Sequence, residues 1–194
     1  MSALGWESPA AFDDLLVAAQ HGDERAITEL YLSLHNSLLR YLAVNARQNA
    51  EDLAQEVWLG VAGSLVNFEG DERQFRTWLF TIARRRLIDH WRASGRRVIE
   101  VSIDTDLPIA STDATQDRVD AQDAIDELTE GLSDAQREIL VLRVVADLSV
   151  DEVATIVGRT PGSVRVIQHR AIRKIAGRLN SVGRDDSSPV AVTP

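Results

Sequence analysis

Apolar residues recur every three or four positions along much of the chain, which is the spacing that gives an α-helix one buried face. Three stretches with this spacing lie in the first half, at residues 27–42, 50–65 and 73–93. Asn49 precedes the second stretch as a candidate N-cap, and a loop around Gly70 separates the second from the third. Because proline is also absent between Ala10 and Leu107, the pattern predicts a first domain of three or four packed helices.

The pattern breaks in the middle of the chain. Between residues 94 and 115 the periodicity disappears, and serine, threonine, aspartate and Pro108 give the composition of a linker. Helical spacing returns near Val119, whereas residues 181–194 show no pattern. The chain is therefore expected to be all-α, with two small helical domains at 1–95 and 119–180, a flexible linker at 96–118 and a disordered tail at 181–194.

Short capping signals set the helix boundaries in the second domain. Ser133 and Ser149 each begin a capping box, in which a hydroxyl and a Gln or Glu three residues later cap a helix. Gly158 breaks the helix that follows Ser149, and Thr160-Pro161 opens the next with a hydroxyl cap and a proline in the first turn. The two helices on either side of Gly158 are therefore expected to form a helix-turn-helix.

Charge is divided unevenly along the chain, whose formal net charge is −9. Residues 73–97 carry eight arginines against a single acid, and residues 159–178 carry six basic residues and no acid. Between these blocks, residues 100–134 hold eleven acids and one base, which makes the linker region acidic. Two basic blocks in an otherwise acidic chain can form locally positive surfaces that the net charge hides. Such surfaces indicate a nucleic-acid partner.

The helix-turn-helix carries one of the basic blocks. Its expected inward side chains are Val153, Val157, Val164 and Ile167, and its expected outer side chains include Arg165, His169, Arg170 and Arg173. A helix fits the major groove, where arginine binds guanine edges and neutralises phosphates. The alternative is an ordinary helical hairpin with a solvated basic face. Because the block contains no acidic partner, DNA binding is the favoured interpretation.

The helix expected at 73–93 carries the other basic block. Phe75, Trp78, Leu79 and Ile82 share one face and are expected to belong to the core. A second face mixes rings with guanidinium groups, at Phe80, Arg84, Leu87 and Trp91. Such interleaving suits single-stranded nucleic acid, because bases stack on rings while arginines neutralise the backbone. For Phe80 and Trp91, packing against a neighbouring helix is the preferred interpretation.

An acidic face is predicted on the helix at 50–65, where Glu51, Asp52, Gln55 and Glu56 share one side. Carboxylates at this spacing hold magnesium in all-helical nucleotide pyrophosphatases if a second helix supplies matching acids, but no such helix is evident. The alternatives are a solvated face and a docking surface for a basic partner. The four histidines lie far apart, and cysteine, a phosphate-binding loop and a serine nucleophile elbow are absent from the sequence. No catalytic centre, metal or cofactor is therefore expected.

The longest run without a charged residue has 12 residues, against the roughly 20 that a membrane-spanning helix needs. Nothing in the first residues has the pattern of a secretory signal. We therefore expect no membrane insertion.

Several of these segments, in this order, resemble the sigma factors of bacterial RNA polymerase. In the first half they are AEDLAQEVW at 50–58, FRTWL at 75–79, IAR at 82–84 and LIDH at 87–90. In the second half they lie at 132–143, at SVDEVA (149–154) and at PGSVR (161–165). The resemblance runs from about Phe12 to Leu179. The absence of a middle domain and of an N-terminal extension points to the extracytoplasmic function (ECF) subfamily.

The resemblance implies an alternative sigma factor that performs no chemistry itself and acts in the cytoplasm. Its N-terminal domain would bind core polymerase and melt the minus-ten element, and its C-terminal domain would read the minus-thirty-five element. The implied partners are the clamp and flap regions of core RNA polymerase, promoter DNA and an anti-sigma factor. The acidic linker would thread polymerase channels that otherwise hold nucleic acid.

The resemblance also assigns residues to each of these contacts. Those implied in binding core polymerase are Asp52, Gln55 and Glu56. Those implied in minus-ten DNA binding are Asn67, Phe68, Arg76, Arg84, Arg85 and Arg86. Those implied in minus-thirty-five DNA binding are Thr160, Ser163, Arg165, Val166, His169, Arg170, Arg173 and Lys174. Two places depart from the family pattern: Arg85 stands where many relatives have asparagine, and Val166-Ile167 where many have Ser-Arg.

Two other functions stay open at this point. One is a helix-turn-helix regulator that binds DNA without polymerase, although such a protein needs neither the Trp78-Leu79 segment nor the acidic face at Asp52. The other is a magnesium-dependent nucleotide hydrolase, which leaves the basic block at 159–178 unexplained. The acidic segment at 100–134 is further expected to fold back on the basic helices, so that the free protein binds promoter DNA poorly.

Overall fold

The computed structural model describes the backbone of residues 9–94 and 127–185 and the side chains of residues 10–94 and 127–179. Within these ranges the regular secondary structure is helical and contains no strand, which confirms the predicted all-α class. The linker predicted at 96–118 and most of the predicted tail lie outside the described residues. In the described part of the chain, no helix is both long enough and apolar enough to cross a membrane.

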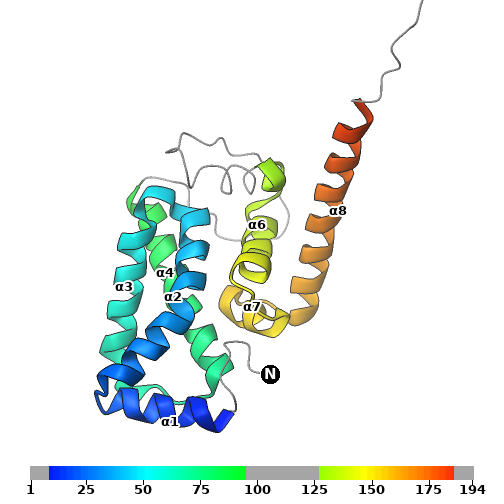
Figure 1. The fold of residues 1–194 in the computed structure, drawn as a ribbon. Helices are drawn as coiled ribbons and strands as arrows, with labels where there is room; N and C mark the ends of the chain where they lie inside the picture. Colours follow the sequence, from blue (N-terminus) through cyan, green and yellow to red (C-terminus); the bar gives the residue numbers. More distant parts are fainter. Residues whose placement is uncertain (1–8, 95–126, 186–194) are drawn as a thin grey trace, which may run out of the picture.

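Between residues 9 and 94, the N-terminal domain contains four α-helices. They are α1 (Pro9–Gln20), α2 (Glu24–Ala46), α3 (Ala50–Ser64) and α4 (Glu72–Ala93), with 3₁₀ turns at Arg47–Asn49 and Leu65–Asn67. Helices α2, α3 and α4 lie side by side, and α1 crosses one end of them (Figure 1). The predicted helices at 27–42, 50–65 and 73–93 are thus confirmed, and α1 is an additional helix that the periodicity did not predict.

Most of the predicted apolar faces form the core of this domain. Leu30, Leu34 and Leu38 of α2 and Phe75 and Leu79 of α4 are almost completely buried. Ile27 is a correction, because 44% of it remains exposed although it shares the predicted face of α2. It lies near the start of α2, where the other helices of the bundle do not cover it.

The start of α4 is fixed by a capping box that the sequence did not reveal as such. The Asp71 carboxylate accepts a hydrogen bond from the Gln74 amide at 2.8 Å, and the Gln74 side chain accepts one from the Asp71 amide at 2.8 Å. Asn49 does occupy the N-cap position of α3, but its side chain makes no capping hydrogen bond there. It contacts the His90 ring at 3.1 Å instead, so it ties α3 to the end of α4.

The C-terminal domain contains α6 (Asp134–Leu140), a π-helical turn (Val141–Val145), α7 (Val150–Val157) and α8 (Pro161–Asp185). Both predicted capping boxes are present, at Ser133 and Ser149. Gly158 ends α7 in the left-handed conformation with φ +68°, and Thr160 caps α8 by accepting a hydrogen bond from the Ser163 amide at 3.2 Å. Helix α8 continues to Asp185, so the predicted disordered tail does not begin at Ser181.

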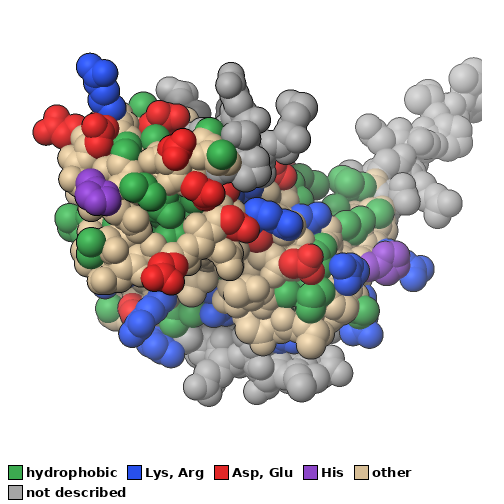
Figure 2. All heavy atoms as spheres, turned by 90° about the horizontal axis from the view of Figure 1, so that it is seen from below, with side chains coloured by type: hydrophobic (Ala, Val, Ile, Leu, Met, Phe, Trp, Pro, Cys, Tyr) green, Lys and Arg blue, Asp and Glu red, His purple; other side chains and the backbone are tan. Residues whose placement is uncertain are grey.

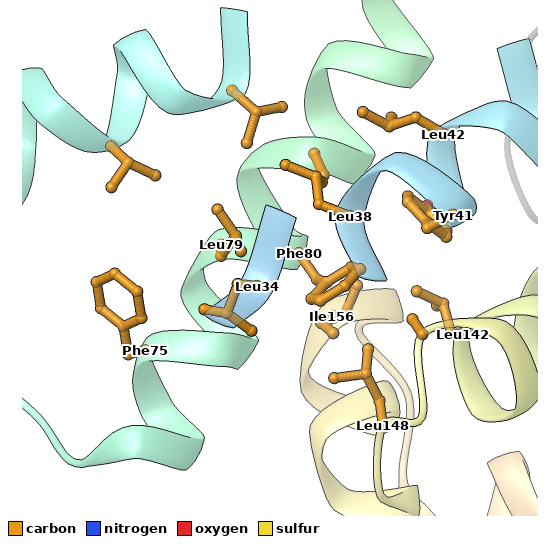
Figure 3. Close-up of a cluster of buried hydrophobic side chains, with 14 of the residues drawn as sticks. Leu34, Leu38, Tyr41, Leu42, Phe75, Leu79, Phe80, Leu142, Leu148 and Ile156 are labelled. Atoms are coloured by element: carbon orange, nitrogen blue, oxygen red, sulfur yellow. The ribbon is translucent and has the colours of Figure 1, made fainter. Parts of the chain in front are cut away.

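The two domains pack directly against each other. Helix α4 of the N-terminal domain lies against α7 of the C-terminal domain, and α2 lies against the π-helical turn. Phe80 and Tyr41 from the first domain and Leu142, Leu148 and Ile156 from the second belong to one buried cluster (Figure 3). No apolar pattern within either half of the sequence revealed this shared core.

Candidate nucleic-acid and partner interfaces

Helix α8 presents the predicted minus-thirty-five residues on its outer side. Arg165, Val166, His169, Arg170, Arg173 and Lys174 are all exposed, as is Thr160 before the helix, while Ser163 is partly buried. At steps of four residues, Arg165, His169 and Arg173 form one row along the helix, and Val166, Arg170 and Lys174 form the next. Lys and Arg side chains gather at this end of the molecule, whereas Asp and Glu lie mainly over the N-terminal helices (Figure 2).

The inner side of α8 explains this orientation. Val164 and Ala171 are fully buried, and Ile167 is partly buried against the same core. Of the predicted inward residues of the helix-turn-helix, Val153 and Val164 are fully buried, while Val157 and Ile167 are partly buried. Because one stripe of α8 is held in the core, the two basic rows on the opposite side are left to solvent.

A surface pocket lies beside the loop that joins α3 to α4. It has a volume of about 400 Å³ and is lined by Ser64, Asn67, Phe68, Glu69 and Trp78. The rings of Phe68 and Trp78 stack with their centres 4.9 Å apart, and Gln20 of α1 donates a hydrogen bond to the Phe68 carbonyl at 2.7 Å. The structure thus brings the predicted Asn67 and Phe68 into one hollow, with an aromatic wall.

Three lining residues were missed by the sequence reasoning. Ser64 and Glu69 carry no motif, and Trp78 was expected to lie wholly in the core. Trp78 is only partly buried, because its ring lies at the edge of the core and forms the pocket wall. The aromatic residues of the FRTWL segment were the signal for Trp78. That signal does not show whether an aromatic ring lies inside the core or lines a surface pocket.

The shape of this loop depends on Gly70. Its φ is +152°, and a Cβ added there would lie 2.7 Å from Gln74 Oε1 and 3.1 Å from the Phe68 ring.

We expect Gly70→Ala to lower the free energy of unfolding by about 1–3 kcal/mol, because the alanine would strain the backbone and clash with the capping box. Urea denaturation of the wild type and the variant measures the difference in the free energy of unfolding. Gly63→Ala on exposed α3 is the control, since nothing lies within 4 Å of the added Cβ and a helical alanine is favoured. Equal stability of wild type and Gly70→Ala would contradict the expectation.

The predicted minus-ten arginines on α4 do not share one exposed surface. Arg85 and Arg86 are exposed, and Arg86 lies 3.9 Å from the Glu56 carboxylate. Arg84 is 21% exposed and donates two hydrogen bonds to Glu138 of α6, at 2.6 and 3.3 Å. Burial alone would lower the pKa of Arg84, but the hydrogen bond and charge of Glu138 outweigh it, so its pKa is raised. Arg84 is therefore a paired cation.

Arg76, which the resemblance places among the minus-ten residues, is not part of an exposed surface in this structure. It is only 4% exposed and lies between the two domains, where it donates hydrogen bonds to the Asp147 and Ala146 carbonyls at 2.7 and 3.5 Å. The reason is its place on α4, one turn before the buried Phe80 and on the same side. The preferred interpretation of Phe80 as a packing residue is confirmed, and Trp91 likewise packs against the core.

The predicted acidic face lies on the outside of α3. Asp52, Gln55 and Glu56 are exposed, while Leu53 and Val57 behind them are buried. Leu59 follows on the same side and is 72% exposed, which the sequence reasoning did not single out. In the described residues, no group of three His, Asp or Glu side chains is arranged to hold a metal ion. The face thus combines exposed acids with one exposed apolar side chain.

Comparisons with known proteins agree with this division of the chain. The family profile of Sigma-70 region 2 matches residues 27–97, and that of Sigma-70 region 4 matches residues 122–175. The chain is 33% identical over 180 residues to the ECF RNA polymerase sigma factor SigD of Mycobacterium tuberculosis, which covers 88% of this chain and 85% of that protein. It is also 33% identical over 174 residues to ShbA, an ECF sigma factor of Streptomyces griseus, covering 83% of this chain and 91% of that protein.

The fold is also similar to that of a solved protein. CnrH, in a complex with the cytosolic domain of CnrY, superimposes with a TM-score of 0.67 at 22% sequence identity, covering 88% of this chain and 97% of CnrH. With two sigma regions in the expected order and relatives that match along most of their length, this chain belongs to the ECF sigma factors of bacterial RNA polymerase and has their role in promoter recognition.

Proposed function

We propose that this sigma factor reads the minus-thirty-five element with the two basic rows of α8. The observation that carries the proposal is that the outer side of α8 exposes three arginines, a lysine and His169, while the opposite stripe is held in the core. Arginine and lysine in a major groove bind guanine edges and phosphates. Thr160 and Ser163 lie at the N-terminal end of this helix, where the backbone amides attract a phosphate.

The minus-ten element is proposed to bind at the pocket beside the Asn67–Phe68 loop and along α4. A base that leaves the duplex must be captured in a pocket, and stacking on aromatic side chains stabilises it there. The stacked rings of Phe68 and Trp78 and the polar Asn67 supply such a surface. Arg85 and Arg86 are exposed further along α4, where they would neutralise the displaced backbone.

Core polymerase is proposed to dock on the acidic face of α3. Asp52, Gln55 and Glu56 would meet basic residues of the polymerase clamp, and the flap would meet the C-terminal domain. An anti-sigma factor is a further partner that family membership suggests. We propose that the chain performs no chemistry of its own and acts in the cytoplasm, where core polymerase carries out the reaction. The proposed domains are those expected from the sequence, at 1–95 and 119–180.

Run-off transcription with purified core polymerase tests the proposal. Genomic fragments should yield discrete transcripts only when both the polymerase and this protein are present. A simple helix-turn-helix regulator would instead bind specific duplex DNA tightly by itself and direct no initiation. A nucleotide hydrolase would release product from nucleoside triphosphates without polymerase.

Two basic residues of α8 are expected to play different parts. Arg165 lies in the first turns, near the bases, whereas Lys174 lies later, near backbone phosphates. We expect Arg165→Ala to cost about 1–3 kcal/mol and to change which minus-thirty-five sequences are used. We expect Lys174→Ala to lower output on all promoters alike and to reduce the salt dependence by about one unit.

Transcription from a library of randomised upstream elements by each mutant holoenzyme measures the difference. Lys174→Ala is the control for loss of positive charge without loss of base contact. If both variants keep the sequence preference of the wild type, α8 does not read bases through Arg165.

A further inference from the structure

Val166 differs from the other side chains on the outer side of α8. It is 50% exposed and does not belong to the buried cluster that contains Val164. Its exposed neighbours on that side are Arg165, His169 and Arg170, which are all basic. Valine is also less favourable in a helix than alanine or arginine, so helix formation does not require it here. Neither core packing nor helix stability therefore explains a valine at this position.

Val166 points almost directly away from the core. An α-helix turns by about 100° per residue, so Val166 lies about 160° around α8 from the fully buried Val164 and about 140° from the fully buried Ala171. Ile172 has nearly the same exposure, at 49%, but lies about 120° around the helix from Val166. In the described part of α8, Val166 is thus the one large apolar side chain in the two basic rows.

The surface beside Val166 is open. A helical side chain leans toward the N-terminal end of its helix, so Val166 covers the turn that contains Gly162. Nothing lies within 4 Å of the position that a Cβ would take at Gly162. A β-branched side chain has one strongly preferred rotamer in a helix, which holds the methyl groups of Val166 beside this space. Near the start of α8 they therefore form a small, rigid apolar surface that a ligand can reach.

The major groove offers one apolar group that such a surface can contact. The first turns of a recognition helix lie closest to the base edges. Each base pair presents a different set of groups there, and thymine presents a C5 methyl group next to its O4 acceptor. Packing this methyl group against an aliphatic side chain removes apolar surface from water, whereas the polar edges of the other bases gain nothing from such a contact.

We propose that Val166 reads a thymine of the minus-thirty-five element through its C5 methyl group. This rests on the proposed role of α8. Arg165 and Arg170, on either side of Val166, would bind guanine edges or phosphates, so the basic residues supply affinity and Val166 supplies a preference for one base. Val166 is also one of the places where this chain departs from the family pattern, and the serine that many relatives have there offers no methyl group for the contact.

The test removes the methyl group from the DNA and leaves the protein unchanged. The probe is a promoter duplex that the wild-type holoenzyme selects from the library of randomised upstream elements. Each thymine of its minus-thirty-five element, on either strand, is replaced in turn by deoxyuridine, which keeps the O4 acceptor and the base pairing and lacks only the methyl group. Competition binding at one fixed salt concentration compares each duplex with its parent, because affinity for DNA depends steeply on salt.

We expect deoxyuridine at one position to weaken binding of the wild-type holoenzyme about fourfold, which corresponds to the loss of one buried CH₂. In the Val166→Ala holoenzyme the same replacement should weaken binding less than about twofold, because the side chain that contacts the methyl group is shortened. Val166 is exposed and alanine is favourable in a helix, so this variant keeps the fold. The two changes form a double-mutant cycle that assigns the contact to Val166.

Ile172→Ala is the matched control. It shortens an apolar side chain of nearly equal exposure on the same helix, but outside the two basic rows, so the fourfold effect of deoxyuridine should persist. An effect of the methyl group on DNA shape or stiffness would persist in Val166→Ala as well. Equal effects of deoxyuridine in the wild type and in Val166→Ala would therefore overturn the inference.

The remaining outcomes separate this inference from the proposed function. If no deoxyuridine weakens binding of the wild type, or if the selected element contains no A·T pair, Val166 does not read thymine. In both cases the selection of a defined element still supports reading by α8. If the holoenzyme selects no upstream element at all, the proposed role of α8 fails, and the role of Val166 fails with it.

Discussion

Reversing two charges on α3, by Asp52→Arg with Glu56→Arg, is expected to abolish binding to core polymerase. Both side chains are exposed, while their neighbours Leu53 and Val57 are buried, so the substitutions leave the core untouched. If the partner surface is basic, each attractive contact becomes a repulsive one, and the loss should reach several kcal/mol, on the order of a thousandfold in affinity. Glu56 also loses a weak surface pair with Arg86, which costs little because both groups are solvated.

Co-purification with core polymerase measures this effect, and circular dichroism confirms that the helices remain. Asp13→Arg with Asp14→Arg on α1 is the matched control, since it makes the same charge change at two exposed positions of another helix. The docking proposal requires normal binding by the control and none by the α3 variant. Equal binding by both proteins would place the core-binding surface elsewhere.

Phe80→Ala is expected to lower the free energy of unfolding by about 3–5 kcal/mol. The ring is fully buried and belongs to the cluster that both domains share, so its removal leaves a cavity at the junction. A loss of this size is a large part of the stability of a small domain, which is about 5–15 kcal/mol in total. It should therefore weaken the N-terminal bundle and the contact with the C-terminal domain together.

Urea denaturation followed by circular dichroism tests this expectation. Leu32→Ala is the control, because Leu32 lies on α2 but is 63% exposed, and its truncation should change stability by less than about 0.5 kcal/mol. If Phe80 instead stacks on a base in solution, as interleaved aromatic and basic residues first suggest, Phe80→Ala would leave stability near the wild-type value and weaken only nucleic-acid binding. That outcome would overturn the packing assignment.

Local signals in the sequence were sufficient for α2, α3 and α4, for the starts of the helices in the C-terminal domain and for the outer side of α8, but not for α1. Periodicity located α2, α3 and α4 because each helix buries one stripe, and the boxes at Ser133 and Ser149 located two helix starts because capping involves residues only three apart. The same reasoning placed Arg165 outward and Val164 inward, since both follow from the period of one helix. Family motifs then supplied the two regions and their order.

Contacts between distant segments were decided only by the tertiary structure. Arg76 carries no signal that separates a DNA contact from a buried one, because its partners at Asp147 and Glu152 come from another domain more than 70 positions away. Trp78 became a pocket wall through its stack with Phe68 across the α3–α4 loop. The sequence by itself determined most of the helices, α1 excepted, and which of their faces are basic or acidic, since these depend on neighbours within a turn or two. Which basic residues are free to bind DNA depended on how the two domains pack, because burial and ion pairing are properties of the assembled surfaces.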